Sequence, residues 1–340
     1  MKSTTFLSSG IKPSRHSVSR RSALQRLAAA GLTTFGSSYS WSQTPYPSRP
    51  IRLVVTLPAG TSADAMARFI AERAGRELGQ PVIVDNRPGA SSIIGAQAVA
   101  TAQADGYTLL YGLAPSISLN PHLFRKLPYK ASDFIPIIHL LDVPFVLIVR
   151  ADSPYRNLRD LLQAAKTQRE TLSYSSYGEG SPNHVAVLQI LQSNGATMTH
   201  VPYKDGGLMD IVAGRVDSSL EVTAMAMPHI QTGKLRPLAV SARERLPQLP
   251  DVPTLAELNF GPPLYSWNGI FAPTGTPPEV VQRLAGVMEG ITSSPEYRQK
   301  VLDFTQVPVG GTPKEFAAFL AKDSEAWGKV IMRSNIRIDQ

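Results

Sequence analysis

Short apolar runs alternate with amphipathic stretches from about residue 50 of the chain onward. The apolar run at 51–57 is bounded by Pro and Gly, as expected of a strand buried on both faces, and further strands are expected at 81–86 and 108–112. Between them, 64–79 and 94–103 carry apolar residues at helical spacing. This β–α–β–α–β order predicts a mostly parallel sheet with helices on both faces.

A second alternating series begins with the apolar strand at 145–150. Its expected strands are 172–177, 199–203, 217–222 and 235–242, and its expected helices are 158–167, 183–192 and 207–212. A further strand at 267–273 precedes helices at 277–292, 295–304 and 313–332. The series predicts a second α/β lobe.

The last three predicted helices have no sheet of their own, which indicates that the end of the chain returns to the first lobe. We therefore expect lobe 1 to comprise 44–147 and 268–340, and lobe 2 to comprise 148–267. The chain would cross between the lobes near 145–151 and near 264–268. Two crossings form a hinge, and hinged lobes can close on a ligand cleft.

The formal net charge of the 340 residues is +8, but the positive charge is concentrated at one end. Residues 1–43 carry six Lys and Arg residues, and the first acidic residue is Asp64. The remainder has a net charge of only +2. A nearly neutral body gives no reason to expect nucleic-acid binding.

The segment 1–43 has the features of a signal peptide, with paired arginines before a short, mildly apolar run. Arg20, Arg21 and Leu24 resemble a twin-arginine signal, although Ala23 and Gln25 depart from that pattern. We expect export to the periplasm, the alternative being a disordered basic tail. No later run is apolar over the length needed to span a bilayer.

Two loops that follow strands are rich in groups able to bind an anion. The first contributes Leu57, Pro58, Ala59, Gly60, Thr61, Ser62 and Asp64, and the second contributes Gly89, Ala90, Ser91 and Ser92. Each precedes a helix, whose first N–H groups and positive dipole end favour a carboxylate. Asp64 would cap the helix or hold the loop. The alternative for each loop is a tight turn with a helix cap.

In the second lobe, the segment from Ser173 to His184 again joins a strand to a helix. Its candidate ligand-binding residues are Tyr177, Gly180, Ser181 and His184, with Asn183 as a further donor. Tyr203, Glu221 and Thr223 are expected to face the same cleft. His184 could bind ligand or act as a base, but a single helical histidine more often makes a structural hydrogen bond.

Signatures of catalysis and of metal binding are missing from the sequence. It has no Cys, its six His are scattered, and no GxSxG, HExxH or P-loop pattern occurs. We therefore expect no metal, no cofactor and no catalytic residue. A hydrolase built on Ser181, His184 and Glu221 is one alternative. A transcriptional effector domain is another, but it would require a DNA-binding module, and none precedes Ile51.

A series of ordered segments resembles one known family over nearly the whole chain after the leader. These segments include YPSRPIRLVV, NRPGA, DGYTLL, VPYK, GKLRPLAV, LPDVPTLAEL, WNGIFAP and VGGTPKEFAAF. They are similar to the Bug, or TctC-like, extracytoplasmic substrate-binding proteins of tripartite tricarboxylate transporters. The resemblance implies a type II periplasmic-binding-protein fold, in which two α/β lobes close on a small carboxylate.

Departures from the family pattern fall in the expected binding loops. Thr61 stands where the family has a second glycine, Thr56 and Leu57 replace a Pro-aromatic pair, and Ser91 and Ser92 occupy positions that are usually glycine. Added side chains narrow the pocket and add hydroxyl donors, so these changes bear on which ligand is bound.

The hypothesis is an exported, monomeric receptor without enzymatic activity. It would capture a dicarboxylate, a tricarboxylate, an aromatic acid or an amino acid, and deliver it to membrane permease subunits. The alternative within the same fold is a ligand sensor that feeds a signalling system.

Overall fold

The computed structural model describes residue 10 and residues 45–168, 171–260 and 265–338. The expected signal peptide therefore lies outside the described residues, apart from Gly10. Residues from Tyr46 onward form one compact unit. None of the helices formed by the described residues is long and apolar enough to cross a membrane.

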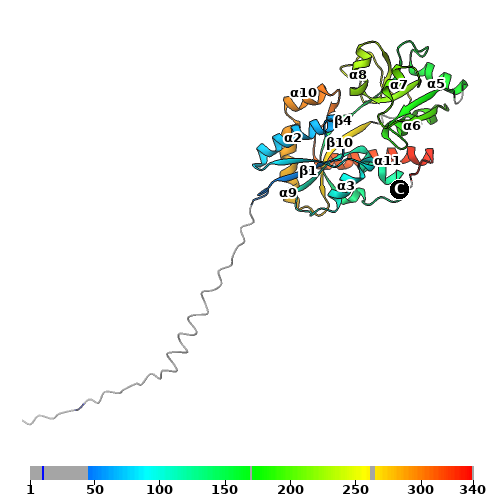
Figure 1. Ribbon diagram of the computed structural model, residues 1–340. Coiled ribbons are helices and arrows are strands. Elements are labelled where there is room, and N and C mark those ends of the chain that lie inside the picture. Colours follow the sequence, from blue (N-terminus) through cyan, green and yellow to red (C-terminus); the bar gives the residue numbers. More distant parts are fainter. Residues whose placement is uncertain (1–9, 11–44, 169–170, 261–264, 339–340) are drawn as a thin grey trace, which may run out of the picture. The chain divides into compact units, whose positions relative to one another are not determined.

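Six strands form the first sheet, in the order β11-β4-β10-β3-β1-β2 (Figure 1). They are β1 (Ile51–Val55), β2 (Val82–Asn86), β3 (Thr108–Leu113), β4 (Phe134–Val143), β10 (Ser266–Pro273) and β11 (Val307–Pro308). β1 pairs in parallel with β2 and β3, whereas β10 runs antiparallel to β3 and β4. The carboxyl ends of β1, β2 and β3 therefore share one edge, where ligand-binding loops of open α/β sheets gather.

Helices cover both faces of this sheet. α2 (Ser62–Leu78) and α9 (Pro278–Thr292) pack with Ile51, Leu53 and Val55 in one hydrophobic cluster. α3 (Ile93–Ala100) and α11 (Pro313–Ser334) belong to another cluster that contains Val54. Because side chains alternate along β1, neighbouring residues of the strand belong to the hydrophobic clusters on opposite faces of the sheet. The shorter elements are η1 (Ala90–Ser92), η2 (Pro115–Leu119), α4 (Asn120–Leu123), η3 (Ala131–Asp133) and α10 (Pro295–Asp303).

Five strands form the second sheet, in the order β7-β6-β8-β5-β9. They are β5 (Phe145–Arg150), β6 (Ser173–Ser176), β7 (Thr199–Pro202), β8 (Ser218–Val222) and β9 (Leu235–Val240). Its helices are α5 (Leu158–Thr167), α6 (Pro182–Ser193), α7 (Leu208–Val212) and α8 (Thr223–Gln231). β6 is parallel to β7 and β8, and β5 is antiparallel to β8 and β9.

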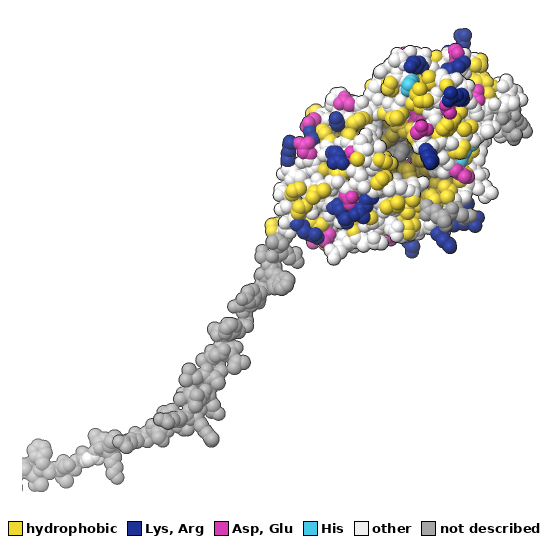
Figure 2. Space-filling view, viewed as in Figure 1, with side chains coloured by type: hydrophobic (Ala, Val, Ile, Leu, Met, Phe, Trp, Pro, Cys, Tyr) yellow, Lys and Arg dark blue, Asp and Glu magenta, His cyan; other side chains and the backbone are white. Residues whose placement is uncertain are grey.

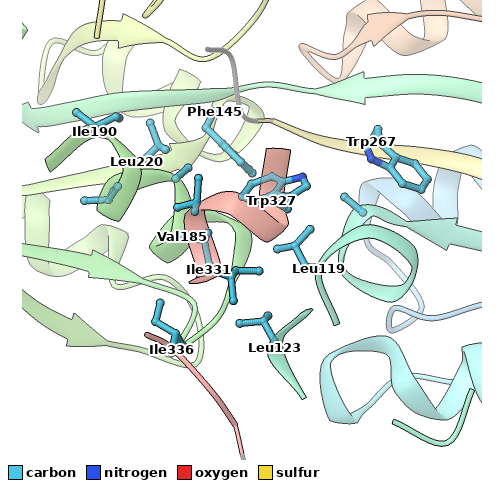
Figure 3. Packing of buried hydrophobic residues seen from close by; sticks show 14 of the residues in the cluster. Leu119, Leu123, Phe145, Val185, Ile190, Leu220, Trp267, Trp327, Ile331 and Ile336 are labelled. Atoms are coloured by element: carbon cyan, nitrogen blue, oxygen red, sulfur yellow. The ribbon is translucent and has the colours of Figure 1, made fainter. Parts of the chain in front are cut away.

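A continuous hydrophobic cluster joins the two sheets. Trp327 and Ile331 of α11 belong to the same cluster as Val185 of α6 and Phe145 of β5. Figure 3 shows the α11 side chains packed beside Val185. Since α11 also contacts β4 of the first sheet, this helix connects the cores of both sheets.

The α/β class predicted from the sequence is confirmed. The parallel arrangement predicted for the first three strands is confirmed for β1, β2 and β3. The whole sheet is mixed, because β10 runs antiparallel between β3 and β4, and β11 runs antiparallel to β4. The chain passes between sheets at Pro144 and before Ser266. The lobe bounds expected at 147/148 and 267/268 would fall inside β5 and β10, and the division into lobes stays a prediction.

Candidate functional site

A cleft of about 230 Å³ is lined by residues from both sheets. The first sheet and its helices contribute Leu57, Ser62, Ala63, Leu113, Val143, Ser266 and Asn268, and the second contributes Phe145, Tyr177, Pro182, Asn183 and Val222. Gln306, which precedes β11, completes the lining. None of these side chains is charged, so any charge on a ligand must be met by dipoles and hydrogen bonds.

The loop between β1 and α2 is held by its own polar groups. Thr61 caps α2, because its Oγ1 accepts from the Asp64 N–H at 3.3 Å and donates to the Pro58 carbonyl at 2.9 Å. Gly60, with φ of 86°, donates its N–H to Asp64 Oδ2 at 3.0 Å. The first two N–H groups of the helix, on Ser62 and Ala63, have no partner within the helix and lie in residues that line the cleft.

Asp64 has its hydrogen-bonding capacity filled by the protein. Besides the Gly60 N–H, it accepts from Arg68 Nε at 3.0 Å and from Asn86 Nδ2 at 2.9 Å. The hydrogen bond from Arg68, opposed by burial and aided by Gly60 and Asn86, lowers the pKa of Asp64 to about 2. The carboxylate is therefore ionised at neutral pH and lies in the first turn of α2, where it partly compensates the helix dipole.

The start of α6 differs, because its first turn carries no acidic residue. Ser181 caps the helix through Oγ, which accepts from the His184 N–H at 3.4 Å, and Pro182 occupies the first turn. The Asn183 side chain donates to the Leu220 carbonyl at 2.6 Å and so fixes the helix start against β8. The Asn183 backbone N–H has no intrahelical partner, which leaves a donor in a residue that lines the cleft.

The half-buried Tyr177 and the buried Glu221 form a hydrogen-bonded pair at the cleft wall. The Tyr177 hydroxyl donates to Glu221 Oε1 at 2.7 Å, and the Val222 N–H donates to the same oxygen at 2.7 Å. Glu221 is fully buried, and its Oε2 has no partner in the described part of the chain. Burial raises the pKa of Glu221 to about 7, although the bond from Tyr177 acts in the opposite direction.

Two buried amide side chains also line the cleft. Asn268 is 1% exposed and donates through Nδ2 to the Tyr111 hydroxyl at 2.9 Å, while its Oδ1 has no partner among the described residues. Gln306 is 3% exposed, and its Oε1 is likewise unpartnered there. Buried polar atoms without a partner are uncommon in folded proteins and mark positions where a ligand or water completes the hydrogen bonding.

The second expected loop adopts an unusual backbone. Gly89, Ala90, Ser91 and Ser92 have φ of 122°, 46°, 52° and 73°, so three consecutive non-glycine residues are left-handed. The buried Asn120 side chain holds this run by donating to the Ser91 carbonyl at 2.9 Å. Gly89, Ala90 and Ser91 are exposed, and no residue of the run is in the cleft lining.

His184 lies in a stack of rings. Its ring is 3.9 Å from that of His200, with Tyr174 on the same stack, and its Nδ1 accepts from the Gly180 N–H at 3.0 Å. Burial, followed by the neighbouring His200, lowers the pKa of His184 to about 4, so the ring is neutral at pH 7. Among the described residues, Ser181, His184 and Glu221 are not joined through their side chains as a hydrolase would require.

Tyr203 and Thr223 make structural contacts outside the cleft lining. The Tyr203 hydroxyl donates to Asp210 Oδ2 at 2.6 Å and so ties the preceding loop to α7. Thr223, at the start of α8, donates both its N–H and its Oγ1–H to the Pro144 carbonyl, at 3.1 and 2.9 Å. Thr223 thus fixes the point where the chain passes from the first sheet to the second.

Of the residues expected at the site, Leu57, Ser62, Tyr177 and Asn183 line the cleft, and Glu221 is hydrogen-bonded to Tyr177. The other expected residues are not part of the cleft lining. Sequence reasoning did not identify several lining residues, namely Ala63, Leu113, Val143, Phe145, Pro182, Val222, Ser266, Asn268 and Gln306. A signal was available for Asn268, which is a polar residue within the otherwise apolar strand from Trp267 to Pro273.

On the face of the molecule in Figure 2, basic and acidic side chains are interspersed, with hydrophobic side chains between them. In the described ranges, no group of three or more His, Cys, Asp or Glu residues is placed to hold a metal ion.

Comparisons with known proteins identify relatives of this chain. The family model described as "Tripartite tricarboxylate transporter family receptor" matches residues 66–336. A UPF0065 protein of Pseudomonas sp., from the tcbD-tcbE intergenic region, is 34% identical, with 96% of this chain and 98% of the relative covered.

Two solved structures from Rhodopseudomonas palustris are also similar. One, solved with adipate, is 32% identical with a TM-score of 0.76, covering 86% of this chain and all of the other. The second, MatC with bound malate, is 28% identical with a TM-score of 0.71, covering 84% of this chain and 100% of its own length.

Proposed function

The chain belongs to the tripartite tricarboxylate transporter receptor family, and on this premise we propose that it captures a small carboxylate-bearing solute in the cleft and delivers it to membrane permease subunits. The observation that carries this proposal is a cleft without charged side chains in its lining, which includes residues from the first turns of α2 and α6 whose N–H groups have no partner within the helix. Such groups bind a carboxylate without burying a cation, whose desolvation would oppose binding.

Transport in this proposal involves no chemical change to the solute. The separate hydrogen bonds of Ser181, His184 and Glu221 favour a binding protein over a hydrolase. The adipate and malate bound to the two similar structures support a small carboxylate as ligand. Residues 1–43 would direct export to the periplasm, where the protein would act as a monomer.

Closure of two lobes would bury the ligand. The passages at Pro144 and before Ser266 would act as the hinge, because every other connection joins strands of one sheet. Closure adds contacts that exist only in the closed state, so ligand binding would shift the population toward it.

A thermal and calorimetric screen of carboxylates on ligand-free full-length protein tests the proposed function. A cognate acid at a hundredfold excess over Kd should stabilise the fold by about 2.7 kcal/mol. Ser62→Phe, at the cleft end of α2, should abolish binding by filling the cleft. The matched exposed variant Ser293→Phe should retain it. No response to any aliphatic, aromatic or amino-acid carboxylate would contradict the proposal.

A further inference from the structure

The two helix starts that reach the cleft are not equivalent. At α2, the ionised Asp64 lies in the first turn and accepts the Gly60 N–H, so a fixed negative charge already occupies the positive end of that helix. At α6, the first turn holds no acid, and the Asn183 N–H faces no competing carboxylate on its own helix. The cleft therefore has one helix start that favours an anion strongly and one whose dipole is already compensated.

The remaining polar groups of the cleft are uncharged. The amides of Asn268 and Gln306 are both buried, and each has an oxygen without a partner in the described residues. A primary amide presents donors and an acceptor together, which suits a hydroxyl or carboxamide group. A second carboxylate beside these amides would lose its hydration with no cation in the lining to compensate.

The rest of the lining is mostly apolar. Leu57, Leu113, Val143, Phe145 and Val222 form the hydrophobic part of the wall. The cavity of about 230 Å³ corresponds to roughly eight waters at the share each has of liquid volume. A short hydrocarbon segment between two polar ends would fit this combination of size and chemistry.

We propose that the ligand is a monocarboxylate whose carboxylate binds at the start of α6 and whose second polar group is uncharged, a hydroxyl or a carboxamide recognised by Asn268 and Gln306. This inference rests on the proposed function and narrows its ligand class. It separates this chain from the similar structures with adipate and malate, both of which are dicarboxylates. Asn268 and Gln306 then determine specificity.

Titration calorimetry of the full chain with matched acids tests the inference. The aliphatic probes are hexanoate, 6-hydroxyhexanoate and adipate, and the aromatic probes are benzoate, 4-hydroxybenzoate and terephthalate. In at least one series the hydroxy acid should bind about tenfold or more tightly than both the diacid and the unsubstituted acid, as one satisfied buried hydrogen bond predicts.

Two variants assign that preference to the amides. Gln306→Leu, which removes an amide whose Oε1 has no partner among the described residues, should bring the affinity for the hydroxy acid close to that for the unsubstituted acid. Asn268→Leu should also reduce the preference for the hydroxy acid. Its control is Tyr111→Phe, which removes the hydrogen-bond partner of Asn268 without changing a cleft-lining residue. Tyr111→Phe should keep the preference.

The outcomes separate this inference from the proposed function. Binding of a diacid as tightly as the hydroxy acid, or tighter, in every series that binds would overturn the monocarboxylate assignment and leave the carboxylate receptor intact. A preference that survives both amide substitutions would overturn the roles of Asn268 and Gln306. Binding of no carboxylate at all would contradict both proposals.

Discussion

Glu221 is a carboxyl group whose burial makes the stability of the protein depend on pH. Its pKa is raised from 4.5 to about 7, so the folded state holds a proton that the unfolded state releases in this range. Stability from this group is fully present below pH 4.5 and falls as the pH rises to about 7. Because a shift of one pKa unit corresponds to about 1.4 kcal/mol, the free energy of unfolding should fall by about 3 kcal/mol over this range.

Replacement of Glu221 isolates this contribution. Glu221→Gln keeps an oxygen for the Tyr177 hydroxyl but has no group that titrates. Its free energy of unfolding, measured with urea and taken relative to that of the wild type, should therefore rise by up to about 3 kcal/mol between pH 5 and pH 7.5. His184 acts in the opposite direction, since its lowered pKa causes stability to fall as the pH drops below 6.5. Because His184 is present in both proteins, its contribution to the pH dependence cancels in the comparison. A constant difference between the variants across this range would contradict the assignment.

Single residues of the site were predictable where loop chemistry indicated them. Ser62 and Tyr177 follow strands in donor-rich loops, and both line the cleft. Asn268 and Gln306 were not predicted, because they come from a strand and a loop far along the chain that meet the cleft only through the tertiary fold. The sequence leaves His184 open as a ligand-binding residue, a base or a structural residue, and the ring stack with His200 supports the structural alternative.

At the scale of elements, the left-handed run at 89–92 holds backbone strain. Ser91 and Ser92 have φ of 52° and 73°, a region that costs a non-glycine residue about 1–2 kcal/mol. Glycine relieves that strain but adds about 0.5–1 kcal/mol of chain entropy. We therefore expect Ser91→Gly to stabilise the protein by about 0.5–1 kcal/mol in urea unfolding, with a similar effect for Ser92→Gly.

The same substitution at an ordinary backbone position is the control. Ser293 is exposed with φ of −78°, so Ser293→Gly releases no left-handed strain and should slightly lower stability. Equal destabilisation at Ser91 and Ser293 would show that the run at 89–92 is not strained.

Most of the longer helices and strands followed from periodicity, and two that did not, β4 and α8, have physical causes, whereas short elements such as α4 and β11 were also not predicted. β4 was not predicted, because Pro136, His139 and Asp142 interrupt its apolar pattern. Both polar residues are buried within β4 itself, with His139 Nε2 2.8 Å from Asp142 Oδ1, so the buried strand does not show the apolar pattern that periodicity detects. α8 was missed because it contains Pro228 and begins directly after β8.

For the whole molecule, the alternating order of elements predicted two α/β series, and the described strands form two sheets. The direction of β10 could not be predicted from that order, because it depends on how the chain returns from the second sheet. The family resemblance, now confirmed, came from ordered motifs along the chain and not from periodicity.

The cluster that joins α11 to α6 should make the two sheets unfold together. Trp327 is fully buried in a cluster containing Val54 of the first sheet and Leu220 of the second, and its Nε1 donates to Asp323 at 3.1 Å. Trp327→Ala should cost about 3–5 kcal/mol, because it leaves a cavity beside both sheets. Wild-type calorimetry should show one transition, with equal calorimetric and van't Hoff enthalpies. Two separated transitions in the wild type would mean that each sheet has an independent core and that α11 does not couple them.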